Sequence, residues 1–166
     1  MKSSQLGAWP WLWLSALVIV LDQLSKAWVL ATLVPGQKLA VIPGFFYWTL
    51  AFNNGAAFSF LANSGGWQRW LFTLLALAIT AVLLVWLKRT RAGDWRTAVP
   101  LALVLGGALG NVIDRIRLGH VTDFILVYFG DWAYPAFNVA DSAVCVGAVA
   151  LILFSFLAPA RDPDVR

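Results

Sequence analysis

Four long apolar runs constrain the fold of this 166-residue chain more than any other feature of its sequence. They cover residues 9–33, 67–87, 97–118 and 137–157. A helix rises ~1.5 Å per residue, so each run is long enough to cross ~30 Å of hydrocarbon. Only 12% of the residues are charged, against about a quarter in soluble domains. The sequence therefore predicts an all-α polytopic membrane protein with four transmembrane helices in a single domain, residues 1–166.

The segment between the first two runs, residues 34–66, has a different pattern. It is rich in β-branched and aromatic residues and contains a turn signal at Pro43-Gly44. We expect short strands that form a small extracytoplasmic β-sheet between the first and second helices. Because this sheet is apolar, we expect it to lie on the bilayer or over the helix bundle. The tail APARDPDVR is expected to be disordered.

The basic residues are distributed unevenly among the connecting segments. One group contains Lys2, Lys88, Arg89, Arg91, Arg96, Arg161 and Arg166, whereas residues 34–66 and 119–136 contain only Lys38. Lysine and arginine collect in cytoplasmic loops, so both termini and the loop between the second and third spans are predicted to be cytoplasmic. The net charge of +4 is explained by this clustering, and no nucleic-acid partner is expected.

Polar side chains inside the apolar runs mark the candidate site. Asp22, Asp114, Asp123 and Asp141 lie in or at the ends of the spans. A charge near the bilayer centre costs roughly 3 kcal/mol, so such residues usually face a partner or a wet cavity. Lys26 is one turn from Asp22, and Asn111, Asp114 and Arg115 share one helix face. All of these groups are predicted to meet in one layer near the outer interface.

Asp123 and Asp141 are the best pair for chemistry, because each is expected at the mouth of a helix and at the same depth. Two carboxylates in one site cannot both ionise easily and share a proton. Such a pair can activate water as a base and protonate a leaving amine as an acid. The alternative is that both are helix caps, close to Asn138 and Ser142.

Other polar residues have a structural alternative beside the functional one. Asp22 and Lys26 form either part of the site or an ion pair that only eases insertion. Arg115 either snorkels to the surface or holds substrate carbonyls with its fixed donors. Asn53 is a turn residue on spacing alone.

No metal site is predicted. His120 is expected to be solvated or to cap a helix, and neither a histidine cluster nor an H-E-x-x-H motif is present in the sequence. Cys145, the only cysteine, is expected to be a small buried hydrophobe. Gly106, Gly107 and Gly110 are expected to form a small face that allows close helix packing.

Four segments of the chain resemble the lipoprotein signal peptidases, also called signal peptidase II: LDQLSKAW, FNNGAAFSFL, GGALGNVIDRIRLGHVTDFI and FNVADSAVCVG. The resemblance implies an aspartyl endopeptidase of the bacterial inner membrane, without metal or cofactor, with its site near the periplasmic interface. It implies cleavage of diacylglyceryl-modified prolipoproteins before the lipidated cysteine, sensitivity to globomycin, and a β-cradle with a short mobile element over the site. A monomer in contact with membrane lipid is expected. The family's catalytic positions fall on Asp123 and Asp141, and its supporting positions on Asp22, Lys26, Asn53, Asn111, Asp114, Arg115 and Asn138.

Two other classes of membrane protein also contain polar residues within their spans. An ion-coupled transporter also contains intramembrane Asp, Lys and Arg residues, but they should be spread across the whole depth of the membrane. The cytoplasmic half of these spans is apolar, which disfavours a transporter. A membrane assembly protein leaves the carboxylates unexplained.

Overall fold

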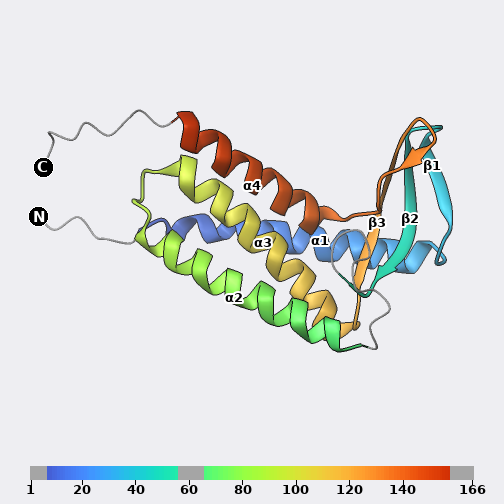
Figure 1. Cartoon of the computed structure of the whole chain (residues 1–166), viewed down its shortest axis with the longest axis horizontal. Helices are drawn as coiled ribbons and strands as arrows, with labels where there is room; N and C mark the ends of the chain where they lie inside the picture. The colour runs from blue at the N-terminus through green and yellow to red at the C-terminus, as the bar shows by residue number, and fades with distance from the viewer. Residues whose placement is uncertain (1–6, 56–65, 158–166) are drawn as a thin grey trace, which may run out of the picture.

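Four long helices form most of the computed structural model, which describes residues 7–55 and 66–157 (Figure 1). They are α1 (Leu12–Thr32), α2 (Trp67–Arg89), α3 (Trp95–Arg117) and α4 (Val139–Leu157), and a short 3-10 helix, Trp9–Trp11, precedes α1. Each is long and apolar enough to cross a membrane. The four predicted spans are therefore confirmed. The tail at residues 158–166 lies outside the described residues.

A four-stranded antiparallel sheet stands at one end of the bundle. Its strands are β1 (Lys38–Ile42), β2 (Phe46–Asn53), β3 (Val121–Phe129) and β4 (Trp132–Ala133), in the order β1-β2-β3-β4. The predicted sheet is present, but two of its strands come from the segment between α3 and α4. Asp123 consequently lies in a strand, and the expectation that it stands at the mouth of a helix was wrong. The β-branched and aromatic residues of β3 favour an extended chain, and β2 offers it a hydrogen-bonding edge.

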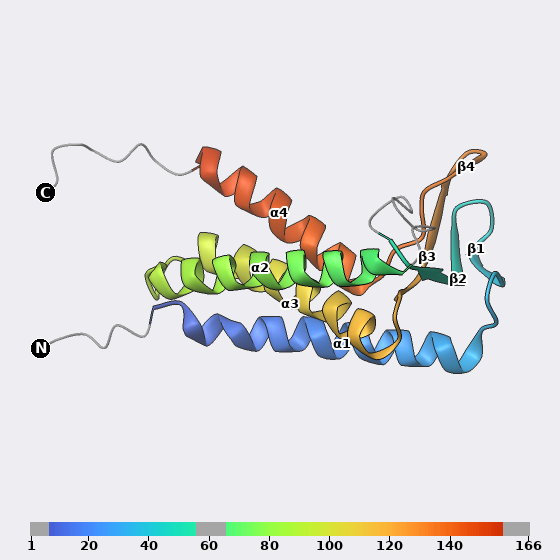
Figure 2. The same ribbon diagram turned by 60° about the horizontal axis from the view of Figure 1, so that its bottom comes forward.

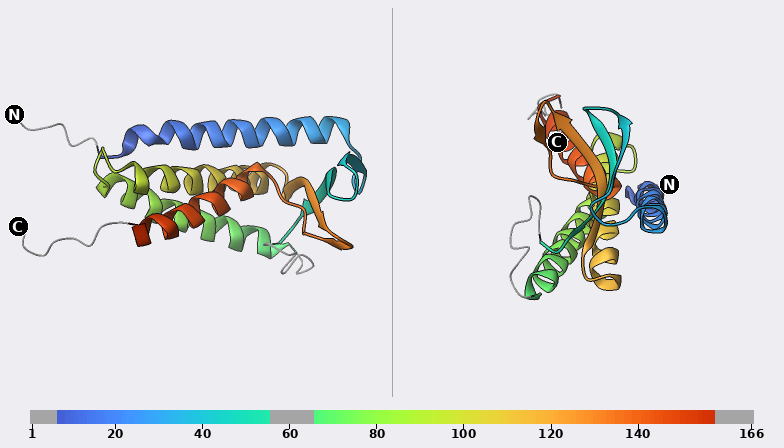
Figure 3. Two further views of the ribbon diagram at one scale, coloured as in Figure 1. Left: turned by 90° about the horizontal axis from the view of Figure 1, so that it is seen from above. Right: turned by 90° about the vertical axis from the view of Figure 1, so that its right-hand side faces the viewer.

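Helix α3 is at the centre of the bundle and packs against α1, α2 and α4. Figure 2 shows α1 and α4 on opposite sides of it. The described ends of the chain lie away from the sheet, and α1 continues alongside the sheet (Figure 3). This arrangement closes one end of the bundle with the sheet and leaves the α2–α3 turn, with Lys88, Arg89 and Arg91, at the other end.

Glycines on α3 allow its neighbours to approach closely. A Cβ atom added at Gly106 would lie 2.7 Å from the Cβ of Val18 on α1, and one added at Gly107 would meet the carbonyl oxygen of Ala140 on α4. A Cβ at Gly110 would lie 2.8 Å from a carboxylate oxygen of Asp22. The predicted small face is confirmed, and it brings the polar residues of α1, α3 and α4 within bonding distance.

Two clusters of buried hydrophobic side chains stabilise the molecule, one near each end of the bundle. The first, away from the sheet, consists of Ala8, Leu83, Leu87, Ala98, Leu101 and Leu105. The second consists of Val29 and Leu33 near the end of α1 with Leu50 of β2 and Phe124 of β3. Burying a large apolar side chain contributes about 1.5–3 kcal/mol. The second cluster therefore fixes the sheet on α1 and sets the position of the residues beside Phe124.

Candidate active site

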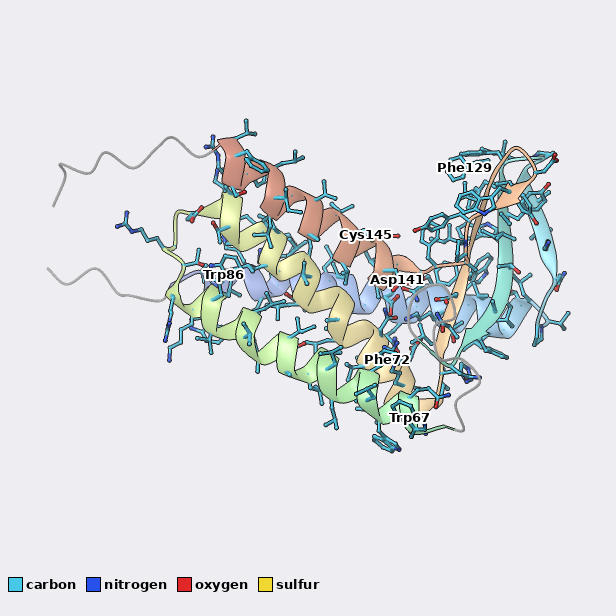
Figure 4. All side chains as sticks on the ribbon, in the orientation of Figure 1. Trp67, Phe72, Trp86, Phe129, Asp141 and Cys145 are labelled. Atoms are coloured by element: carbon cyan, nitrogen blue, oxygen red, sulfur yellow. The ribbon has the colours of Figure 1, made fainter. Side chains whose placement is uncertain are left out.

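A cavity of about 670 Å³ opens between the sheet and the neighbouring ends of α3 and α4. Its polar lining comes from Asn53, Asn111, Arg115, Asp123, Asp141 and Ser142, and its apolar lining includes Phe52, Val127, Phe129, Tyr134, Phe137 and Cys145. Asp141 and Cys145 lie on the side of α4 that faces the sheet (Figure 4). The cavity thus has an apolar wall on the sheet side and a polar patch that contains two carboxylates.

Asp123 is held in the cavity wall by the pairing of β3 with its neighbours. The backbone N–H groups of Phe124 and Ile125 both donate to the carbonyl of Phe137, which fastens β3 to the start of α4. The amide of Asn53 donates to Asp123 Oδ2 (3.2 Å), and that of Asn138 donates to Oδ1 (2.8 Å). Burial raises the pKa of Asp123 to about 7, the charge of Asp141 acts in the same direction, and these amide donors oppose the rise. This carboxyl group can therefore gain or lose a proton at neutral pH.

Asp141 stands in the first turn of α4 and has two roles in the geometry. The N–H of Asp141 donates to Asn138 Oδ1 (2.9 Å), and the N–H of Asn138 donates back to Asp141 Oδ2 (3.3 Å). This reciprocal arrangement is a capping box. The other carboxylate oxygen accepts from Asn111 Nδ2 (2.7 Å), and Asp141 lines the cavity. The capping alternative thus describes Asp141 in part, whereas for Asp123 it is wrong because that residue lies in a strand.

Asn138 connects the two carboxylates. Its side chain donates to Asp123 and accepts from the backbone of Asp141, and the residue is completely buried. Its amide nitrogen is also 3.3 Å from Asn111 Oδ1 and 3.3 Å from the carbonyl oxygen of Thr122. One amide group therefore fixes the positions of Asp123 and Asp141 relative to each other.

An ion triad, formed by Asp22, Lys26 and Asp114, lies behind the cavity. Lys26 Nζ is 2.8 Å from Asp22 Oδ2 and 2.9 Å from Asp114 Oδ2, and it donates to Asn111 Oδ1 at 3.0 Å. The three residues of the triad are at most 2% exposed. The predicted Asp22–Lys26 pair is present, but Lys26 also binds α3. The geometry therefore goes beyond the alternative in which this pair only eases insertion.

The side chain of Arg115 turns into the molecule. Its Nη2 donates to the carbonyl of Gly55 at 3.2 Å, its guanidinium lies 5.7 Å from the ring centre of Phe72, and it lines the cavity. This position contradicts the snorkelling alternative, in which the charge would lie at the surface. The N–H donors of the Arg115 guanidinium therefore line the same cavity as the carboxylates of Asp123 and Asp141. The segment after Gly55, residues 56–65, lies outside the described residues, and so does the short mobile element expected over the site.

Cys145 and His120 lie in surroundings that differ from each other. Cys145 is exposed and lines the cavity, so the prediction of a buried residue was wrong. The α4 face that carries Cys145 looks toward the sheet across the cavity, and none of the described helices packs on it. His120 is half-buried, and its ring centre lies 4.3 Å from that of Phe52. Burial lowers the pKa of His120. Among the described residues, no group of His, Cys, Asp or Glu side chains could hold a metal ion.

The structure thus brings the nine predicted site residues together. Five of them line the cavity: Asn53, Asn111, Arg115, Asp123 and Asp141. The other four, Asp22, Lys26, Asp114 and Asn138, are buried behind it and bond to the first set or to the backbone beside it. Gln23 was missed by the sequence analysis. Its amide donates to Asp114 Oδ1 (2.9 Å) and lies 3.2 Å from Asp22 Oδ2, and only its place between Asp22 and Lys26 could have pointed to it.

Comparison with known proteins identifies the family. The family model of signal peptidase (SPase) II matches residues 14–157. The chain is 61% identical over 151 residues to a lipoprotein signal peptidase of Pseudomonas aeruginosa strain UCBPP-PA14, covering 90% of this chain and 89% of that protein. It is 58% identical over 144 residues to that of Xanthomonas campestris pv. campestris strain 8004, covering 87% and 86%.

Solved structures agree with the sequence comparison. A bacterial membrane enzyme determined by the in meso method superposes with a TM-score of 0.78 at 29% identity, covering 95% of this chain and 94% of the other. A second such structure gives a TM-score of 0.75 at 30% identity, covering 91% and 94%. With four spanning helices, this chain is a multi-pass bacterial membrane protein, and a protease rather than a transporter or an assembly factor. The chain belongs to the signal peptidase II family, the lipoprotein signal peptidases.

Proposed function

We propose that this protein is an aspartyl endopeptidase in which Asp123 and Asp141 form the catalytic pair. The observation that carries the proposal is the pair itself: two carboxylates, from a strand and a helix, share Asn138 and line one cavity. The pKa of about 7 for Asp123 supports a state in which the pair holds one proton at neutral pH. Hydrolysis of a peptide bond then requires only a water molecule in addition to the two carboxyl groups.

The reaction follows from that protonation state. The ionised carboxylate takes a proton from a water molecule, whose oxygen attacks the peptide carbonyl carbon. The protonated carboxyl group gives its proton to the carbonyl oxygen, and a gem-diol forms. When the C–N bond breaks, the leaving nitrogen takes a proton from one carboxyl group and the gem-diol returns one to the other. The pair ends the cycle with one proton, as it began.

The substrate is a prolipoprotein that carries diacylglyceryl on a cysteine, and the cut lies immediately before that cysteine. Such a substrate keeps its acyl chains in the outer leaflet, and the cavity, at the sheet end of the helices, has an apolar wall. Arg115 and Asn53 line the cavity beside the pair and are placed to donate to substrate carbonyls. We place the enzyme in the inner membrane as a single-domain monomer in contact with membrane lipid, with cytoplasmic termini, a periplasmic sheet and sensitivity to globomycin.

Replacement of each aspartate tests the proposal. Asp123→Asn and Asp141→Asn should each abolish cleavage of a lipidated precursor peptide by purified enzyme in detergent micelles, because an amide cannot exchange the shared proton. Asp131→Asn is the matched control, since Asp131 is an exposed aspartate in the turn between β3 and β4. It should cleave like the wild type. Turnover by either pair variant, in folded protein, would refute the mechanism.

A further inference from the structure

The ion triad binds the backbone immediately before each aspartate of the pair. Asp114 Oδ2 accepts from the N–H of Thr122 at 3.0 Å, and Thr122 directly precedes Asp123 in β3. Asp22 Oδ1 accepts from the N–H of Ala140 at 2.9 Å, and Ala140 directly precedes Asp141 in α4. Each carboxylate of the triad therefore binds the backbone N–H of the residue that precedes one aspartate of the pair. One of these bonds fixes β3 and the other fixes α4.

Lys26 joins these two attachments and adds a third. Its ammonium group has three donors, and three acceptors surround it: Asp22, Asp114 and Asn111. Asn111 in turn donates to Asp141 Oδ1 at 2.7 Å. The bond from Lys26 to Asn111 Oδ1 assigns the amide orientation, so that the nitrogen of Asn111 faces Asp141. Every donor of Lys26 thus acts on a group that contacts the pair or its backbone.

Resting on the proposed function, we infer that the triad is a positioning device that sets the separation of Asp123 and Asp141, with Lys26 as the link between the two sides. None of its three members lines the cavity, so it acts through other residues and does not touch the substrate. Its loss changes the geometry of the reacting groups and leaves the substrate-binding walls in place. The turnover number kcat should therefore fall while KM changes little.

Lys26→Arg is the sharpest variant, because it keeps the buried charge but replaces a compact group of three donors with a planar fork. The expected result is folded protein with kcat lower by at least ~10-fold and KM within about 2-fold of the wild type, since a small misplacement of reacting groups is costly. Ser15→Ala is the matched control. Ser15 is buried on the same helix and its hydroxyl donates to the carbonyl of Ala102 on α3 at 2.7 Å. It should lower the unfolding temperature and leave kcat unchanged.

Asp114→Asn provides a second measurement if Lys26→Arg does not fold. The amide keeps an acceptor for Thr122 but loses the ion pair with Lys26, and kcat should again fall with KM unchanged. Combining Asp22→Asn with Asp114→Asn should cost less than the product of the single losses, because both act through Lys26. A kcat near that of the wild type in a folded variant, or a change confined to KM, overturns the inference. If Asp123→Asn and Asp141→Asn are inactive in the same assay, the aspartate pair still stands; if they are active, the proposed function itself has failed.

Discussion

Replacing Asn138 tests whether its amide positions the two aspartates of the proposed pair. Asn138→Ala removes the amide that donates to Asp123 and also the oxygen that caps the N–H of Asp141. Asn138→Asp keeps a capping oxygen but places an acceptor where the donor to Asp123 had been. Both variants lose the donor, and only the alanine variant loses the cap.

The magnitudes follow from these bonds. A hydrogen bond to a charged group contributes about 1.5–3 kcal/mol, which corresponds to roughly 10- to 160-fold in rate if the bond positions the reacting carboxylate. Loss of an N-cap costs about 1 kcal/mol. We therefore expect both variants to lose at least ~10-fold in kcat. Both should also unfold at a lower temperature: Asn138→Ala because it loses the cap, and Asn138→Asp because it buries a further carboxylate against Asp123. The additional carboxylate of Asn138→Asp, close to the pair, should make its kcat the lower of the two.

Cleavage of a lipidated precursor peptide in detergent micelles, followed on gels, measures kcat and KM, and thermal unfolding of the same preparations reports stability. Ser155→Ala is a suitable control, because Ser155 also lies on α4 but outside the cavity lining, and its hydroxyl donates to the carbonyl of Ile152 at 2.7 Å. It should stay close to the wild type in kcat. An Asn138→Asp enzyme that cleaves within about 3-fold of the wild type would refute the positioning role of this amide.

Three further outcomes are expected. Arg115→Lys should leave the protein folded but weaken cleavage by at least ~10-fold, on the order of 1.4 kcal/mol, because the planar fork is lost; wild-type cleavage would remove Arg115 from the site. Asn53→Ala removes a donor that lowers the pKa of Asp123, so that pKa should rise above about 7 and the pH–rate profile should move to higher pH; an unmoved profile would contradict the contact. Reporter fusions at Arg91 should be cytoplasmic and insertions near Lys38 external; the reverse would place the site on the wrong side of the membrane.

The sequence predicted the helices well because their signal is strong: uninterrupted apolar runs of the length that a bilayer requires. It also predicted which polar residues would meet, since depth along each span can be counted from its ends. The strand β3 was missed, although Val121–Phe129 contains the β-branched and aromatic residues that favour a strand. Its nine residues directly follow the third span, and this position favours a connection when the sequence is read alone.

Contacts between helices could not be predicted from spacing. The i, i+4 rule gives the bond from Lys26 to Asp22 but not the bond to Asp114, which depends on how closely α1 and α3 approach at Gly110. Gln23 was missed for a related reason: a neutral amide in an apolar run does not stand out as a charge does. The exposure of Cys145 depends on which face of α4 is left without a neighbour, and apolar composition alone does not give that face.

The bond from Asp22 to the N–H of Ala140 joins residues 118 positions apart in the sequence. During biosynthesis α1 enters the membrane before α4 has been made. Asp22 therefore lacks its bond to the N–H of Ala140 until α4 is in place. Lys26, one turn away on the same helix, is available at once and can neutralise Asp22 within α1. In the proposed mechanism, the site is complete only after α4 has inserted and supplied both Asp141 and the N–H of Ala140. A chain that stops before α4 would therefore lack one aspartate of the proposed pair and should be inactive.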